Sequence, residues 1–292
     1  MPTKRKKSIK NPLLPELVLG GSVLVIAIVA IIVFLVSPKP EPKPVPSVPT
    51  QITEPATQAT KPVPLTSNPL KPGDFSKPGA FVSCLTQDYA LGIDVSEWQT
   101  EIDWTEVANT VDTEGRRIEF VMIRAGRRGE EQGGLYEDTM ARKHYAGAKA
   151  AGLKVGAYFF SQAISSQEAV EEANFLLEIT RDWQLDMPVV FNWEHRADQY
   201  RTAVVDAPLL TQCVRAFCDT VSQAGHTPMV YFNVADSFGR LQLQELTAYQ
   251  FWLAQYDGFL DYPYRVEMWQ YTETGKVPGI DGNVDINLYF KW

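Results

Sequence analysis

The feature that most constrains the fold is an alternation of two patterns between residues 90 and 290. Short apolar runs of strand length are separated by stretches whose apolar residues recur at helical spacing. The runs of strand length are 90–95, 120–125, 154–160, 187–191, 227–232, 251–256, 266–271 and 284–290. The helical patterns are 104–111, 138–151, 166–183, 207–224 and a shorter 237–246. Strands that alternate with helices predict βαβ units and a mainly parallel sheet covered by helices.

The order of these elements predicts the fold class. About five β-α units come first, and three further strands follow with little helix between them. This order favours an α/β fold, an irregular (β/α)-type barrel. Ser165 or Ser166 is positioned to cap one helix, and Gly152 and Gly225 to end two others. An open doubly wound sheet is the alternative, although neither a dinucleotide-binding glycine motif nor a P-loop follows the first strand.

A separate feature at the N-terminus predicts attachment to a membrane. Residues 17–36 form an uncharged run of twenty residues, about 30 Å long as a helix, which matches a bilayer core. The basic cluster before it predicts that residues 1–16 stay in the cytoplasm and that the body is exported. A cleaved signal peptide is the alternative, but the run is long for one and positions 36–38 offer no small-x-small cleavage site. We therefore expect a single-pass protein of the cell membrane with an extracellular body.

Residues 37–80 change character again. Prolines occupy nearly every second position between 38 and 49 and recur as far as position 78. Such a segment cannot bury a core and favours an extended polyproline spacer, here an extracellular linker before a domain at 81–292. Residues 1–80 carry a net charge of +6 and the whole chain −8, which leaves −14 on residues 81–292. So acidic a body is unsuited to binding nucleic acid.

Cysteine and histidine usage gives no metal or cofactor site. The histidines stand singly, without the spacing of a ligand motif, so we expect no metal and no cofactor. The odd number of cysteines leaves at least one free thiol, and buried free thiols are the simplest interpretation. The residues concerned are His144, His195, His226, Cys84, Cys213 and Cys218, and a disulfide between Cys84 and either of the others stays open.

The carboxyl ends of the predicted strands carry the candidate site, because chemistry in such barrels sits at that end. Asn192 and Glu194 are two apart on one strand and therefore share a face. The candidate catalytic residues are Asp94, Asn192, Glu194 and Asp285, and the candidate substrate-binding residues are Tyr158, Phe160, Tyr231, Asn233, Gln255, Trp269 and Tyr271. Carboxyl groups beside aromatic and amide side chains are typical of a carbohydrate site. Each also has an ordinary alternative, since strand-end polar residues often cap helices and Trp269 can fill the barrel.

The same positions carry a family resemblance. The motifs are Gly-Ile-Asp-Val-Ser-Glu-Trp-Gln at 92–99, Ile-Asp-Trp at 102–104, Gly-Ala-Tyr-Phe-Phe at 156–160, Pro-Val-Val-Phe-Asn-Trp-Glu at 188–194, Trp-Gln-Tyr at 269–271 and Gly-Asn-Val-Asp-Ile-Asn at 282–287. Together, over about residues 88–292, they resemble glycoside hydrolase family 25, the Chalaropsis-type lysozymes. The resemblance implies an N-acetylmuramidase that cleaves the β-1,4 bond after N-acetylmuramic acid in peptidoglycan glycan strands. It also implies Glu194 as general acid/base, with Asp94 and Asp285 as supporting acids.

One position departs from the family pattern. The fourth strand usually ends Asp-x-Glu in the family, whereas this chain has Asn192 before Glu194. The family is thought to use the substrate's own 2-acetamido group, with the missing carboxylate steering it. The alternatives are a weakened or inactive peptidoglycan-binding relative and an unrelated barrel hydrolase of another glycan. Retention of Glu194, Asp94 and Asp285 together favours the enzyme, in a Gram-positive-type envelope. The sequence identifies no protein partner.

Overall fold

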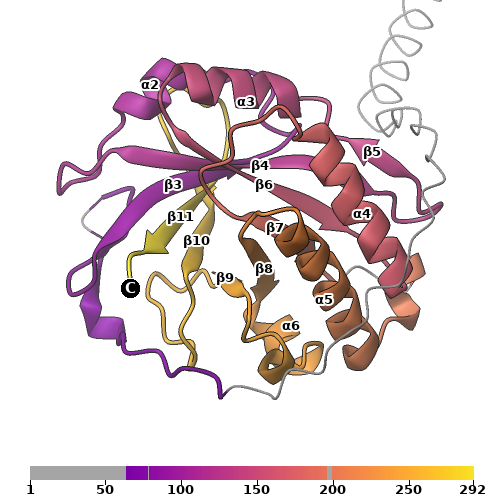
Figure 1. The fold of residues 1–292 in the computed structure, drawn as a ribbon. Coiled ribbons are helices and arrows are strands. Elements are labelled where there is room, and N and C mark those ends of the chain that lie inside the picture. Colours follow the sequence, from indigo (N-terminus) through magenta and orange to yellow (C-terminus); the bar gives the residue numbers. More distant parts are fainter. Residues whose placement is uncertain (1–63, 78, 196–198) are drawn as a thin grey trace, which may run out of the picture. The chain divides into compact units, whose positions relative to one another are not determined.

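The computed structural model describes residues 64–77, 79–195 and 199–292, and these form a closed barrel of eight strands with helices outside it (Figure 1). All eight predicted strands are present. Around the barrel they are β3 (Tyr89–Val95), β4 (Ile118–Arg128), β6 (Lys154–Ser161), β7 (Val189–Trp193), β8 (Pro228–Asn233), β9 (Gln250–Ala254), β10 (Met268–Gly275) and β11 (Val284–Phe290). The ladder closes because β3 pairs with both β4 and β11. The mixed α/β barrel expected from the sequence is therefore confirmed.

The helices follow the strands as the alternating pattern predicts. They are α2 (Trp104–Asn109), α3 (Ala141–Ala150), α4 (Ser166–Ile179), α5 (Ala207–Gln223) and α6 (Val234–Gly239), and the short elements are η1 (Pro72–Asp74), β1 (Phe75–Ser76), β2 (Ser83–Cys84), β5 (Leu135–Glu137), η2 (Arg201–Val204) and η3 (Leu243–Glu245). The hydroxyl of Ser165 accepts the backbone N–H of Glu168 and caps α4. Gly152 and Gly225 have φ of +82° and +85° just after α3 and α5, a conformation that glycine adopts without strain.

The last strand runs against the others. Strands β3 to β10 pair in parallel around the barrel, whereas β11 is antiparallel to both β10 and β3. The loop between β10 and β11 is too short for the crossover that a parallel strand would need. The start of β11 therefore lies at the end of the barrel where the other strands finish. Asp285 reaches that end from the beginning of its strand, not from the carboxyl end that the sequence suggested.

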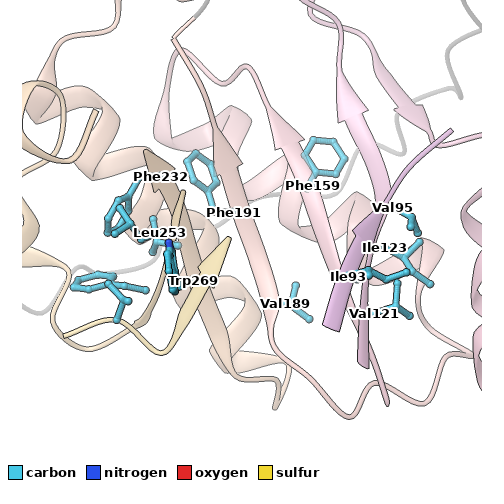
Figure 2. Close-up of a cluster of buried hydrophobic side chains, with 14 of the residues drawn as sticks. Ile93, Val95, Val121, Ile123, Phe159, Val189, Phe191, Phe232, Leu253 and Trp269 are labelled. Atoms are coloured by element: carbon cyan, nitrogen blue, oxygen red, sulfur yellow. The ribbon is translucent and has the colours of Figure 1, made fainter. Parts of the chain in front are cut away.

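Side chains alternate between the inside and the outside of the barrel. The outward-facing residues pack under the helices, and Figure 2 shows part of this layer, including Phe159 of β6, Phe191 of β7 and Phe232 of β8. A smaller cluster fills the interior below the mouth. Its large members include Phe120 of β4 and Trp252 of β9. The interior is thus plugged at one end, which leaves the carboxyl end of the barrel for polar side chains.

The segment before β3 covers the outside of β10. Phe75 packs its ring against the edge of Trp269 with centroids 5.0 Å apart. Upstream, Ser67 forms an isolated β-bridge with Tyr264, and the side-chain amide of Asn68 donates to the carbonyl of Tyr262. Part of the stretch that its prolines assigned to the linker therefore packs on the barrel, and Leu65, Leu70 and Phe75 contact the core.

The predicted cytoplasmic tail (1–16), membrane helix (17–36) and residues 37–63 of the predicted linker lie outside the described residues. Within the part that is described, no helix is long and apolar enough to cross a bilayer. Cys84, Cys213 and Cys218 are all buried and free, which confirms the prediction of free thiols.

Candidate active site

Four chemically active side chains come together at the carboxyl end of the barrel. Asp94 is the last but one residue of β3, Asn192 is the last but one of β7, Glu194 follows β7 directly, and Asp285 is the second residue of β11. Asp94 and Asn192 are each only 6% exposed. Asp94, Asn192 and Asp285 each alternate with outward-facing core residues, so their side chains point into the barrel. The strands thus bring these predicted residues to one mouth.

Asp94 and Asp285 form a pair. They face each other directly across the antiparallel β3–β11 ladder, which places their Cβ atoms about 5 Å apart. The side-chain amide of Gln270 donates to Oδ2 of Asp94 at 2.9 Å and to Oδ2 of Asp285 at 3.1 Å. Asn287 donates to the same oxygen of Asp94 at 2.8 Å. Two carboxyl groups this close cannot both carry charge without strong repulsion.

The surroundings of the two acids differ in what they do to each pKa. Burial is the largest cause that raises the pKa of each acid, and the total rise is larger for Asp285. The negative charge of Asp94 then raises the pKa of Asp285 further. Hydrogen bonds from Asn287 and Gln270 oppose the effect of burial on the pKa of Asp94. The pair therefore holds a proton on Asp285 at a pH where an ordinary carboxyl has lost it.

Gln270 was not among the residues that the sequence suggested. It lies between Trp269 and Tyr271 on β10 and points inward, where its Oε1 accepts the hydroxyls of Tyr231 at 2.9 Å and Tyr256 at 2.7 Å. Tyr256, just after β9, was also missed. The alternation from Met268, which belongs to the interior cluster, could have identified Gln270 as the inward residue of this strand.

Four of the predicted substrate-binding residues make packing or capping contacts within the fold. Trp269 and Tyr271 point outward into the layer beneath the covering segment and are fully buried there, so the expectation for both is corrected. The side-chain amide of Gln255 donates to Asp257 and Asp261, and the backbone carbonyl of Gln255 accepts the indole N–H of Trp269. The side chain of Asn233 caps α6 by accepting the backbone N–H of Asp236. These residues have structural roles.

The remaining predicted residues line the interior or the mouth. Tyr158 of β6 and Tyr231 of β8 are buried in the interior cluster, each with its ring edge against Trp252. Burial raises the pKa of Tyr231 well above its ordinary value, and the charge of Glu194 raises it further, so its hydroxyl stays a hydrogen-bond donor. Phe160 is partly buried and pairs with Asn192 in the β6–β7 ladder.

Asn192 carries an unsatisfied acceptor. Its Oδ1 is buried and has no hydrogen-bond partner among the described residues. A buried carbonyl oxygen without a donor costs about 1–3 kcal/mol. Such an atom at the mouth of a barrel suits a ligand that brings an N–H or O–H group.

The positive charge of Arg124, on β4, is already neutralised by two acids. Arg124 ends the inward face of β4, and its Nε donates to Asp138 at 2.7 Å while a terminal nitrogen donates to Glu97 at 2.9 Å. Arg124 is therefore not available to neutralise the carboxyl groups at the centre of the mouth. Among residues 64–77, 79–195 and 199–292, no three His, Cys, Asp or Glu side chains are grouped so as to hold a metal ion.

A closed barrel of this kind, with acids and amides walled by tyrosines inside its carboxyl mouth, defines a glycoside hydrolase. The model of glycosyl hydrolases family 25 matches residues 93–280, and the chain belongs to this family. The family resemblance inferred from the motifs is thereby confirmed, and so is the class of enzyme.

Relatives and solved structures agree with this assignment. The chain is 30% identical over 207 residues to the uncharacterized protein YegX of Escherichia coli K12, covering 68% of each. It is 24% identical over 212 residues to lysozyme M1 of Streptomyces globisporus, covering 68% of this chain and 67% of that protein. The autolysin LytC of Streptococcus pneumoniae, solved with a synthetic peptidoglycan ligand, superposes with a TM-score of 0.58 at 25% identity, covering 69% of this chain and 46% of that one.

Proposed function

We propose that the protein is a membrane-anchored muramidase that hydrolyses the β-1,4 bond between N-acetylmuramic acid and N-acetylglucosamine in peptidoglycan. The observation that carries the proposal is the meeting of Asp94, Asp285 and Glu194 at one mouth in a chain of this family. The similarity to a lysozyme and to an autolysin solved with a peptidoglycan ligand supports the substrate. A protein that only bound glycans would have no need of three acids in this arrangement.

Glu194 acts as the general acid/base. It is partly exposed just beyond β7, so it can meet a glycosidic oxygen that enters from solvent. Its charge affects both Tyr231 and Asp285, which puts it at the same mouth as the buried acids. Glycoside hydrolysis needs one carboxylic acid to protonate the leaving oxygen, and Glu194 is the member of the set best placed to do so.

Asn192 steers the substrate's acetamido group. Its buried Oδ1 has no partner among the described residues and can accept the acetamido N–H when the sugar binds. The acetamido oxygen is then directed at the anomeric carbon. It attacks this carbon and displaces the leaving sugar, whose glycosidic oxygen is protonated by Glu194. Lacking a charge, Asn192 stabilises the positive acetamido group less than a carboxylate would. The result is a slow enzyme.

The location follows from the N-terminal sequence. The basic cluster before the uncharged run at 17–36 keeps the N-terminus in the cytoplasm, and the barrel is then outside the membrane. Residues 37–63 are rich in proline and allow the barrel to stand off from the bilayer toward the wall. Peptidoglycan glycan strands are thus within reach of an anchored enzyme.

The experiment is digestion of purified peptidoglycan by the full-length protein in detergent, followed by borohydride reduction and mass analysis of the products. A muramidase yields fragments whose reduced end is N-acetylmuramitol. Fragments that end in reduced N-acetylglucosamine would assign a different bond and contradict the proposal.

The second candidate is a peptidoglycan-binding relative without activity, favoured by the Asn at position 192. It predicts that the native protein and Asn192→Asp both sediment with walls and that neither releases fragments. Release of fragments by the native protein would eliminate it.

A further inference from the structure

Gln270 makes four hydrogen bonds inside the barrel with one side-chain amide. Its Oε1 accepts two tyrosine hydroxyls, from Tyr231 and Tyr256, and its Nε2 donates to the two carboxyl groups of the acid pair. Gln270 is itself only 2% exposed, so water cannot substitute for these partners. This residue is therefore the link between the tyrosine wall and the acid pair.

The amide of Gln270 can adopt only one orientation. Reversal would direct its oxygen at the carboxyl oxygens of Asp94 and Asp285, where acceptor meets acceptor. It would also direct the NH₂ group at two hydroxyls that now donate. Burial raises the pKa of both tyrosines, so these hydroxyls keep their protons. A tyrosine hydroxyl can also accept, so it is the carboxyl oxygens of Asp94 and Asp285 that favour the orientation in which the two N–H groups face the acids.

Asn287 is fixed in the same way from the other side. The indole N–H of Trp252, which can only donate, reaches Oδ1 of Asn287 at 2.8 Å. The NH₂ group of Asn287 must therefore face Asp94, where it donates to Oδ2. Asp94 then receives two amide N–H groups on one oxygen, whereas Asp285 receives the single longer one from Gln270. The arrangement favours a negative charge on Asp94 over one on Asp285.

Among the other charged and titratable groups around the pair, two acids act in the same direction and the rest are neutral or already paired. Glu194, beyond β7, and Glu273, on β10, both disfavour charge on Asp285. Tyr158 on β6, Tyr231 on β8 and Tyr256 after β9 stay neutral because burial raises each pKa. Arg124 on β4 is held by Asp138 and Glu97.

We propose that Gln270 is the positioning residue of this site: its fixed amide keeps Asp94 and Asp285 sharing one proton, with the charge on Asp94 and the proton on Asp285. This proposal rests on the proposed function, because the pair serves the sugar that binds at the same mouth. It makes Asp285 a hydrogen-bond donor to Asp94, and it makes Asp94 the single anion of the pair.

The test follows the protonation of both acids without substrate. Full-length protein labelled with carbon-13 at the aspartate carboxyl groups is titrated by NMR, and the two signals are assigned with Asp94→Asn and Asp285→Asn. We expect Asp94 charged and Asp285 protonated at neutral pH. In Gln270→Leu, Asp94 loses one donor to its charge and should take up its proton at a pH higher by about 1–2 units, since a hydrogen bond to a charged group is worth about a tenfold to hundredfold change in the equilibrium.

Two further variants keep the test decisive. Trp269 is the neighbour of Gln270 that faces outward. The variant Trp269→Phe loses packing but should leave the titration of Asp94 at its native pH. If Gln270→Leu does not fold, Tyr231→Phe combined with Tyr256→Phe frees the amide while keeping Gln270, and a smaller shift in the same direction is expected. Two charged acids at neutral pH in the native protein, or an unmoved Asp94 in the folded variants, would overturn the proposal. Because no substrate is used, this outcome is independent of whether the protein hydrolyses walls.

When the rate of wall hydrolysis is measured against pH, Gln270→Leu should shift the limb set by the titration of Asp94 to higher pH by the same interval, about 1–2 units. A change in rate at every pH with no movement of the limb would mean a purely structural role and would also count against the proposal.

Discussion

Restoring a carboxyl group at position 192 should change both the rate and the pH range of hydrolysis. Asn192 and Glu194 are two residues apart at the end of β7, so an added charge would lie about 7 Å from Glu194. Two unit charges at that distance repel by about 2.4 kcal/mol at an effective dielectric constant of about 20. This corresponds to about 1.7 pH units.

The direction of the effect follows from the role of Glu194. It must be protonated to act as the acid, and a neighbouring negative charge makes it keep its proton to higher pH. Asn192→Asp should therefore move the alkaline limb of the pH–rate profile upward by about 1.5–2 pH units. It should also raise kcat/KM on walls at the optimum by about a hundredfold, the typical contribution of one preorganised partner in the transition state.

The assay is release of reducing ends from purified walls across a pH series, with Asn192→Ala as the neutral control. The control removes the acceptor without adding charge, so it should lower the rate and leave the alkaline limb in place. If the alkaline limb of the pH–rate profile of Asn192→Asp lies at the native pH or at a lower pH, the electrostatic reasoning is refuted. A lower rate in Asn192→Asp would mean that the site is tuned to an amide.

Three further predictions concern stability and topology. Trp269 is fully buried and Trp98 is 77% exposed, so Trp269→Ala should lower the free energy of unfolding in urea by about 3–5 kcal/mol and Trp98→Ala by less than about 0.5 kcal/mol; similar losses would contradict the outward core position of Trp269. The raised pKa of Asp285 means that the folded state keeps a proton which the unfolded chain releases near the ordinary value of 3.8, so Asp285 should contribute a fall of about 1.4 kcal/mol per pH unit in the free energy of unfolding as the pH rises from that value to about 9. Urea unfolding at a series of pH values should show this fall flattened in Asp285→Asn, and an unchanged slope would mean that Asp285 titrates normally. Protease added to wall-stripped cells should remove the barrel and leave a small membrane-bound fragment, whereas recovery of a soluble form that starts near residue 37 would show cleavage instead of anchoring.

The strands and helices could be predicted from the sequence because their patterns are local. Apolar runs separated by amphipathic stretches and capped by residues such as Ser165 depend only on neighbours in the chain. The acids could be placed at one mouth because each follows or begins an apolar strand. That part of the site needed only the alternation and the class of fold.

The errors arose where long-range packing decided the outcome. Trp269 and Tyr271 were expected to face the substrate because aromatic residues bind sugars, but the segment before β3 covers the outside of β10 and buries them there. Gln270, between them, then faces the acids. The direction of β11 depends on pairing with β3, which lies nearly two hundred residues earlier, so no local signal could reveal it.

The most direct test of the account is the fate of Glu194→Gln. Full-length native and variant proteins are compared for release of reducing ends from purified peptidoglycan and, in parallel, for sedimentation with intact walls. The account predicts that the variant binds walls as the native protein does, keeps its unfolding midpoint and releases almost no reducing ends, because only the acid that protonates the leaving oxygen has been lost. A variant that still clears walls at a rate comparable to the native protein would contradict it.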